Sequence, residues 1–408
     1  MDEIIKTKLG INLAWITSGK KKYIECIEKC KKLNITYIRI ILSSWSLNAL
    51  SEKSKQNELK EILDICEINK LEVHLTLMNF VDYNKYVYND TNTPDYSWLG
   101  NVYNKKHKIS RQTFFETLQE VFKKDIENLF FLLNQYGNIR NIELINECDQ
   151  IEIGCTLKFK WINQFISFLK SKYPTYNYSI SISNHLLYKK YKENIKCTID
   201  LHMYSFPTES MALNILEYNG NVVGEFAKYS DYHNIDSINS RIYFTAGIWI
   251  ASLLNYKVTP LHWWWDELLE SEAYCKIIKF FNNKKFSLKS NKYVLIKQIV
   301  FSKELNKSKE NRKIYERIIN IIKHPLILIH ELNSIKKFLY KKVYEEKNHR
   351  IIYFYEENIY FIETYQKIYT HNLVLSKKAK IYNLINAKCI KSNDILEPGV
   401  YVITDVQL

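Results

Sequence analysis

The chain has 408 residues, of which 46% are hydrophobic, and this supplies enough apolar side chains for a large core. Its formal net charge of +14 would suit an acidic partner such as nucleic acid or a membrane surface. The lysines, however, are spread over most of the predicted helices, and abundant Asn, Ile and Tyr are typical of AT-rich codons, so we expect no nucleic-acid partner. No apolar run reaches the ~18–20 residues of a membrane span, so we expect none.

The N-terminus, MDEIIKTKLGINLAWI, lacks the basic segment followed by an apolar segment that marks a secretory signal. Cys26 and Cys30 lie one turn apart on a predicted helix, but no second ligand pair follows, and none of the eight cysteines forms a CxxC pair. These features favour a reduced, cytoplasmic protein without metal or other cofactor. A secreted protein whose leader lies outside the sequence would look the same. His74 stands among apolar residues and is interpreted as a structural histidine.

Short apolar segments alternate with longer amphipathic ones from the N-terminus to about residue 283. Several short segments are apolar almost throughout, as in strands covered on both faces. The predicted strands are 9–15, 37–42, 71–78, 139–145, 178–183, 198–203, 221–226 and 258–264. The predicted helices are 20–33, 55–69, 113–136, 157–172, 185–193, 208–217, 236–254 and 267–282. Eight β–α units in this order predict an α/β fold, a (β/α)8 TIM barrel.

Two segments of this barrel stand out. In the predicted helix 113–136, Thr113 and Glu116 fit a capping box, and Gly137 stands at the expected C-terminal stop. The connection 79–111 is unusually long, and its position after the third strand predicts that it lies on the face that carries the active site.

The pattern changes after the barrel. We predict a barrel domain over 1–283, a basic linker and helical segment over 284–345, and a small antiparallel β domain over 346–408. The last region holds short β-type runs, with the turn signal Pro398-Gly399 before the final one. We interpret this domain as a packing appendage, with carbohydrate binding as the alternative.

Catalytic groups of such barrels lie at the C-terminal ends of the strands. The polar and aromatic residues expected there are Arg39, Asn146, Glu147, His202, Tyr204, Glu225, Trp263, Trp264, Trp265 and Asp266. Two glutamates suit glycosidic bond cleavage, because one can protonate the leaving oxygen while the other attacks the anomeric carbon. Arg39 is informative because a guanidinium inside an apolar strand needs a partner. Asp266 is interpreted as the N-cap of the helix that follows.

Five segments in chain order, YIRIIL, ELINECD, DLHMYS, VVGEFAK and HWWWD, resemble glycoside hydrolase clan A, particularly the family 5 cellulase and mannanase group. WLGNVYN, residues 98–104, also looks like the mannanase-like members. The resemblance covers about residues 8–283. It departs from the family at the third strand, where Asn79 stands in place of a frequent His, and residues 284–345 have no counterpart.

The resemblance implies a retaining glycoside hydrolase that cleaves β-glycosidic bonds in an oligo- or polysaccharide. Glu147 would be the acid/base and Glu225 the nucleophile. The implied substrate-binding residues are Asn146 at the sugar 2-hydroxyl, Arg39 and Tyr204 beside Glu225, His202 lining the site, and Trp263 under the scissile bond, with Trp265 on the same side by strand alternation.

Two other classes of function stay open. A metal-dependent barrel, such as a sugar isomerase or a phosphodiesterase, would use hard ligands drawn from Glu147, Asp200, His202, Glu225 and Asp266. Asn and Trp flank these carboxylates where further ligands would be expected. A non-catalytic sugar-binding barrel would keep the same fold, but the presence of both glutamates together with Arg39 and Tyr204 argues against it.

Overall fold

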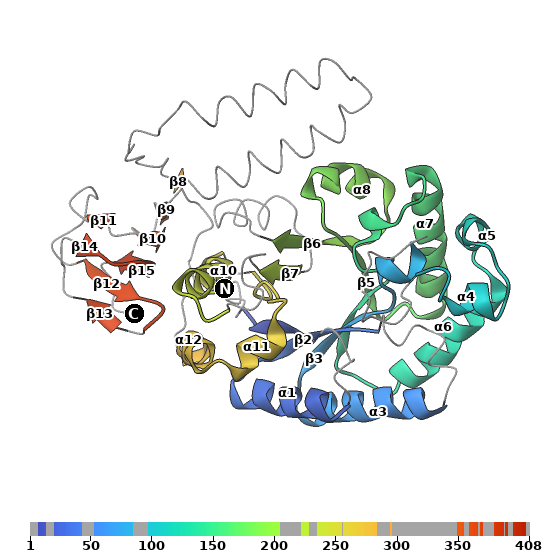
Figure 1. Ribbon diagram of the computed structural model, residues 1–408, viewed down its shortest axis with the longest axis horizontal. Helices are drawn as coiled ribbons and strands as arrows, with labels where there is room; N and C mark the ends of the chain where they lie inside the picture. The colour runs from blue at the N-terminus through green and yellow to red at the C-terminus, as the bar shows by residue number, and fades with distance from the viewer. Residues whose placement is uncertain are drawn as a thin grey trace, which may run out of the picture.

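The computed structural model contains a parallel sheet surrounded by helices and a second, antiparallel sheet (Figure 1). It describes residues 7–13, 20–42, 53–84, 97–204, 222–227, 235–254, 256–283, 294–295, 349–354, 359–365, 368–369, 379–386, 388–390 and 395–404.

Seven strands of the larger sheet follow chain order, and each is parallel to the next. They are β1 (Gly10–Leu13), β2 (Tyr37–Ile41), β3 (Glu72–Thr76), β4 (Ile139–Glu143), β5 (Asn177–Ile182), β6 (Thr198–Tyr204) and β7 (Val223–Ala227). Nearly every side chain in these strands is buried, whichever way it points, because helices cover the outside and other side chains fill the inside. This double burial explains the continuous apolar segments in the sequence.

The predicted eighth strand closes the barrel as an irregular segment. Parallel bridges join Val258 to Lys8 and His262 to both Ile11 and Phe226. The N–H of Leu261 donates to the carbonyl of Val223 over 3.0 Å. Pro260 has no N–H, so a regular ladder cannot run through this segment. The predicted (β/α)8 barrel is therefore confirmed. Its eighth stave, the segment 258–264 in the place of the eighth strand, lacks regular strand pairing.

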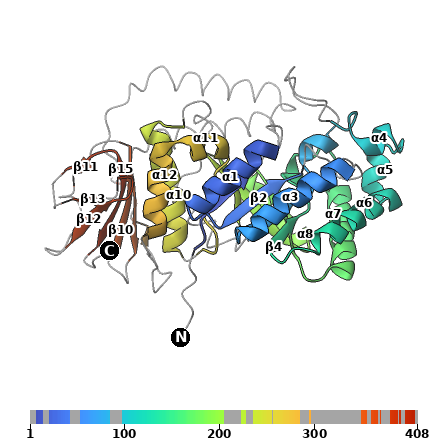
Figure 2. The same ribbon diagram turned by 90° about the horizontal axis from the view of Figure 1, so that it is seen from below.

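The longer described helices lie close to the predicted amphipathic segments (Figures 1 and 2). The predicted helix 267–282 is divided at Ser271, whose backbone is extended, and the predicted connection 79–111 contains short helices. The longer ones are α1 (Lys20–Lys32), α3 (Lys53–Ile68), α6 (Glu120–Leu133), α7 (Cys155–Lys172), α10 (Ile238–Leu253) and α12 (Glu272–Asn283). The shorter ones are η3 (Phe80–Tyr83), α4 (Val102–Lys105), α5 (Arg111–Glu116), η4 (Cys148–Gln150), η5 (His185–Leu187), α8 (Tyr188–Asn194) and α11 (Trp265–Glu270). The predicted helix 208–217 falls outside the described residues. Within the described ranges, no helix has both the length and the apolar character of a membrane span.

The prediction of one helix over 113–136 is wrong, because the chain leaves the helix at Thr117, whose backbone is extended, and re-enters it after Gln119. The side-chain amide of Gln119 donates to the carbonyls of Thr113 and Thr117, which the end of α5 leaves without helical partners. The capping box is also wrong: Ser110 is the N-cap of α5 and accepts from the N–H of Thr113.

Helix α10 is buried almost all round its circumference, which is unusual for the outer helix of a barrel. On one side Gly247 lies against Phe226 of β7, where a Cβ atom would come within 2.4 Å of the ring. On the other side the antiparallel sheet covers the helix, and both views show that sheet next to α10 (Figures 1 and 2). The sequence FTAGIWIASL is apolar apart from Thr245 and Ser252 because both faces of the helix are covered.

The C-terminal region forms a six-stranded sheet in the order β13-β12-β15-β10-β9-β8, which confirms the predicted small antiparallel β domain. Its strands are β8 (Val294–Leu295), β9 (His349–Phe354), β10 (Ile359–Thr364), β12 (Lys380–Asn383), β13 (Lys388–Ile390) and β15 (Gly399–Thr404), and β11 (Ile368–Tyr369) pairs separately with β14 (Ile395–Leu396). Phe361, Val400 and Val402 belong to the same hydrophobic core as the barrel. β8 comes from the segment 284–345, which was predicted as a basic linker and helical segment, and the rest of that segment lies outside the described residues.

Candidate active site

Glu147 follows the end of β4 and has a strained backbone. Its φ of 47° and ψ of 50° lie in the left-handed region, which residues other than glycine rarely adopt. The N–H of Glu147 donates to the hydroxyl of Ser181 over 2.8 Å, and this contact holds the turn in place. The strained turn therefore sets the direction in which the Glu147 side chain leaves the barrel rim.

The structure brings Glu147 and Glu225 together on either side of His202. Nδ1 of His202 lies 2.9 Å from Oε1 of Glu147 and 3.3 Å from Oε2 of Glu225. One oxygen of each carboxyl group and one His202 nitrogen all lie within 4.8 Å of one another. The Glu147 side chain is 15% exposed and that of Glu225 only 4%, so Glu147 is the more accessible of the two.

The two carboxyl groups have pKa values displaced in opposite directions. Burial raises the pKa of Glu147, the charge of Glu225 adds to the rise, and His202 opposes it without reversing it. Burial also acts to raise the pKa of Glu225, but His202, Arg39 and the Tyr204 hydroxyl together hold it below its ordinary value. The surroundings thus shift Glu147 toward the protonated form and Glu225 toward the ionised form, relative to an ordinary glutamate.

His202 carries the positive charge between them. Burial alone would lower its pKa, but Glu225 and Glu147 raise it to about 10. Gly224 leaves room for this ring: a Cβ atom there would lie 3.0 Å from Nε2 of His202. The glycine of the GEF segment is therefore favoured by the neighbouring imidazole, which a larger side chain would displace.

Arg39 is fully buried, and all five of its N–H groups have acceptors. Nε and Nη2 donate to the two oxygens of Glu143 over 2.7 and 3.0 Å, and Nη2 also donates to Oδ1 of Asn146 over 2.6 Å. Nη1 donates to Glu225 and to Asn12, each over 3.1 Å. The guanidinium thus has the partners that its position in an apolar strand requires.

The same contacts fix the orientation of Asn146. Its Oδ1 accepts from Arg39 and Ser181, so the amide nitrogen must face the other way. One proton of that nitrogen donates to Oδ1 of Asn79 over 3.3 Å. The second amide proton has no partner among the described residues. On the other side of the pair, Oε2 of Glu225 accepts from the hydroxyl of Tyr204 over 2.6 Å.

The aromatic residues after the eighth stave are arranged differently from the prediction. Trp265 begins α11, its ring meets Tyr23 edge-on, and it is 3% exposed. Strand alternation therefore does not place it beside Trp263, which is half-buried. The N-cap of α11 is Trp264, and Asp266 forms an ion pair with Lys22 in the first turn.

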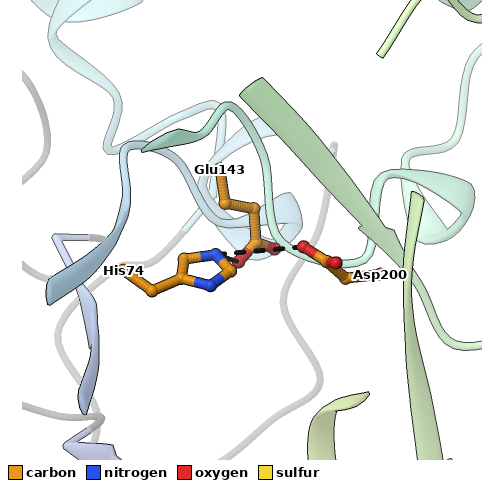
Figure 3. Close-up of side chains that lie close together, drawn as sticks. All are labelled: His74, Glu143 and Asp200. Atoms are coloured by element: carbon orange, nitrogen blue, oxygen red, sulfur yellow. Dashed lines mark hydrogen bonds and ion pairs between the residues drawn. The ribbon is translucent and has the colours of Figure 1, made fainter. Parts of the chain in front are cut away.

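Among the residues that the structure describes, two groups of side chains have the composition of a metal site. One is Glu147, His202 and Glu225; the other, fully buried, is His74, Glu143 and Asp200 (Figure 3). The first group contains the protonated imidazole of His202, and Arg39 forms an ion pair with one glutamate of each group. Positive charge therefore already lies close to the carboxylates that would bind a cation. Asp200 and Asp266 lie apart from the first group, so the predicted hard ligands do not form one cluster.

Glu143 is the functional candidate that the sequence interpretation missed. It stands in an apolar strand, IRNIELI, as Arg39 stands in YIRIIL. The argument that a buried guanidinium needs a partner applies equally to a buried carboxylate, and the two together would have identified the pair.

Comparisons with known proteins support the fold. No protein-family model and no curated protein matches the sequence. Among solved structures, the chain is similar to a family 39 glycoside hydrolase from the gut symbiont Bacteroides cellulosilyticus, at 9% identity with a TM-score of 0.52, over 99% of this chain and 82% of that one.

Two mannanases are also similar to part of the chain. The endo-β-1,4-mannanase from Thermotoga petrophila is 12% identical over 64% of this chain and 68% of that one, with a TM-score of 0.45. The β-1,4-D-mannanase from Cryptopygus antarcticus is 16% identical over 63% and 84%, with a TM-score of 0.44. The resemblance to glycoside hydrolase clan A is confirmed for the fold, on the likeness to the family 39 enzyme.

Proposed function

We propose that the protein is a retaining glycoside hydrolase that cleaves β-glycosidic bonds. The observation that carries this proposal is the close approach of Glu147 and Glu225, whose nearest carboxylate oxygens lie within 4.8 Å. Retaining enzymes hold their carboxyl groups ~5–5.5 Å apart, whereas inverting enzymes need ~6.5–9.5 Å to admit a water molecule. The separation here suits direct attack by a carboxylate.

In the first step, Glu147 gives its proton to the glycosidic oxygen while the Glu225 carboxylate attacks the anomeric carbon. The bond to the leaving oxygen breaks, and an ester forms between the sugar and Glu225. In the second step, Glu147, now a carboxylate, takes a proton from water, which attacks the same carbon and releases Glu225. Two inversions give overall retention, and Glu147 is protonated again at the end.

The neighbouring side chains support these roles. Arg39 and Tyr204 hold both oxygens of Glu225, which orients the carboxylate for attack. The unpaired amide proton of Asn146 is available to the 2-hydroxyl of the sugar. We assign Trp263 to the floor of the subsite where the bond breaks, because it is half-buried directly after the eighth stave.

We propose an oligo- or polysaccharide as the substrate. The sequence motifs favour a β-linked glucan or mannan, and a panel of substrates can identify which one. Mannan, glucan, xylan and aryl glycosides would be compared at equal enzyme concentration.

The test of the mechanism is covalent trapping. The protein is incubated with 2-deoxy-2-fluoro glycosides of the gluco, manno and xylo series, and the adduct is located by peptide mass spectrometry. We expect one sugar on Glu225, and none on the Glu225→Gln variant. An adduct on a different residue, or turnover of a glycoside in this series without any adduct, would contradict the proposal.

A second test separates the two glutamates. Glu147→Ala should lose about 10²–10⁴ in rate on a substrate with a poor leaving group, because no acid protonates it. It should lose much less in glycosylation by an activated aryl glycoside. Equal losses would refute the acid/base role. Activity lost to a chelator and restored by a divalent cation would instead favour the metal-dependent barrel.

A further inference from the structure

Beside the candidate catalytic pair lies a second cluster of ionisable groups, His74, Glu143 and Asp200, all with fully buried side chains (Figure 3). Asp200 precedes His202 by two residues on β6, so both side chains point to the same face, with Asp200 one layer closer to the start of the strands. Nε2 of His74 lies 3.1 Å from Glu143 and 3.9 Å from Asp200. A layer of buried ionisable side chains therefore underlies the active site.

Arg39 is the main hydrogen-bond partner of Glu143. Oε2 contacts Nε of Arg39 at 2.7 Å, the hydroxyl of Thr76 at 2.8 Å and Nε2 of His74 at 3.1 Å. Oε1 accepts from Nη2 of Arg39 over 3.0 Å. Both oxygens of Glu143 thus contact Arg39, and Thr76 and His74 complete the surroundings of Oε2. Any effect of Glu143 on the catalytic pair is therefore transmitted first to Arg39.

We propose that Glu143 is a positioning residue that fixes the Arg39 guanidinium against the nucleophile Glu225. The inference rests on the proposed function. Because a guanidinium is planar, two hydrogen bonds to one carboxylate define its plane and its rotation within that plane. With Nε and one Nη2 proton held by Glu143, Nη1 faces Glu225. Thr76 and His74 hold Glu143 in turn.

Charge adds to this geometric role. Arg39 lies between two carboxylates, Glu143 and Glu225, whose pKa values are both held below the ordinary one against the effect of burial. Without the charge of Glu143, Glu225 would be the one carboxylate in the described part of the chain that pairs with Arg39, and the guanidinium would attract it more strongly. A carboxylate held more tightly attacks the anomeric carbon more slowly, and a guanidinium that has lost one acceptor no longer orients it. Both effects slow the same step.

Asp200 supplies a matched control. It is a fully buried carboxylate of the same cluster, and its Oδ1 accepts from the N–H of Val222 over 3.0 Å. No contact joins it to Arg39 among the described residues. Glu143→Gln and Asp200→Asn thus each replace one buried carboxylate by an amide of the same shape, and only the first touches the guanidinium.

The experiment measures the rate constant and the final stoichiometry of trapping by the fluorinated glycoside that labels the wild-type protein. We expect Glu143→Gln to reach one sugar per chain, but at least ~10-fold more slowly, which corresponds to about 1.4 kcal/mol. The factor should be the same for poor and activated leaving groups, because the nucleophile serves both. Asp200→Asn should be trapped at a rate close to that of the wild type.

The outcomes separate the inference from the proposed function. If the wild type is not trapped, the proposed function fails. If the wild type is trapped and Glu143→Gln matches its rate, the inference is overturned. Lower stoichiometry at an unchanged rate would show a purely structural role, and equal slowing in Asp200→Asn would show a general effect of buried charge; either overturns it.

Glu143→Asp covers the case in which the Gln variant does not fold. It keeps the negative charge on a side chain one methylene shorter, which cannot reach both Nε and Nη2. We expect one sugar per chain and a trapping rate below that of the wild type. Trapping at the wild-type rate would contradict the need for a two-point contact.

Discussion

Replacement of Arg39 by alanine tests the buried charge network independently of any substrate. The change leaves Glu143 and Glu225 buried without the guanidinium that donates three hydrogen bonds to them. Removal of one partner from a buried ion pair costs about 3–5 kcal/mol, because the remaining charge is desolvated without compensation. A domain has a total stability of roughly 5–15 kcal/mol, so Arg39→Ala should unfold at a much lower denaturant concentration.

The size of this loss should depend on pH. In the wild type, the pKa values of Glu143 and Glu225 lie below 4.5, so their contribution is present above about pH 4.5 and is lost as the pH falls through the folded-state values. In Arg39→Ala, burial without Arg39 raises both pKa values. The folded variant then takes up these protons at a higher pH than the wild type, so its stability rises relative to the wild type as the pH is lowered. Each pKa unit corresponds to about 1.4 kcal/mol.

The assay is urea unfolding followed by circular dichroism at pH 7 and pH 5. We expect the free-energy difference between Arg39→Ala and the wild type to be smaller at pH 5. Arg140→Ala is the control, because its side chain is 57% exposed and pairs with Glu72 at 3.3 Å. That pair should contribute about 0–1 kcal/mol. A difference for Arg39→Ala that is equal at both pH values, or larger at pH 5, would refute the reasoning.

Three further predictions concern turnover. The pH profile of kcat/KM should be bell-shaped: activity falls at acid pH as Glu225, with a pKa below 4.5, takes up a proton, and at alkaline pH as Glu147, with a pKa above 4.5, loses one. Initial rates across pH check this, and a profile without the alkaline fall would count against Glu147 as the acid. Gly224→Ala should lower kcat, because the added methyl group meets His202 at 3.0 Å. Gly154→Ala is the control, because nothing lies within 4 Å of the added methyl group, and its kcat should not change. Equal kcat values for the two variants in steady-state kinetics would contradict the role of His202. Trp263→Ala should raise KM more than it lowers kcat, and an unchanged KM would remove Trp263 from the substrate site.

The order and type of the barrel elements could be predicted from the sequence because burial leaves a direct trace in it. Strands such as YIRIIL are covered on both faces and are apolar throughout, and the one charged residue in that strand marks the site. The irregular eighth stave was located correctly, but its lack of regular pairing depends on Pro260 and on the register of both neighbours. The sequence did not predict the break in the helix at Thr117, because the helical spacing of apolar residues continues across it. The side-chain amide of Gln119 satisfies the backbone carbonyls at the break.

Contacts between distant segments set the limit of the sequence interpretation. Trp265 was assigned by alternation, which holds only within a strand, and the helix begins at that residue. Glu143 lies 104 positions from Arg39, and no local pattern joins them. The apolar character of α10 was visible, but its cause, a second sheet packed on the outer face, requires the position of residues more than a hundred positions away.

The network also explains how buried charge is tolerated during the proposed reaction. Before the reaction, Arg39 and His202 are positive, Glu143 and Glu225 are negative, and Glu147 is neutral, so the cluster has no net charge. Once Glu147 has given its proton away and Glu225 has become an ester, the negative charge has moved from one glutamate to the other. Both lie within 3.3 Å of Nδ1 of His202, so the same imidazolium faces the charge in either position. The total charge of the site is therefore constant through the covalent step, and no counter-ion has to enter a pocket in which burial makes an unpaired charge costly.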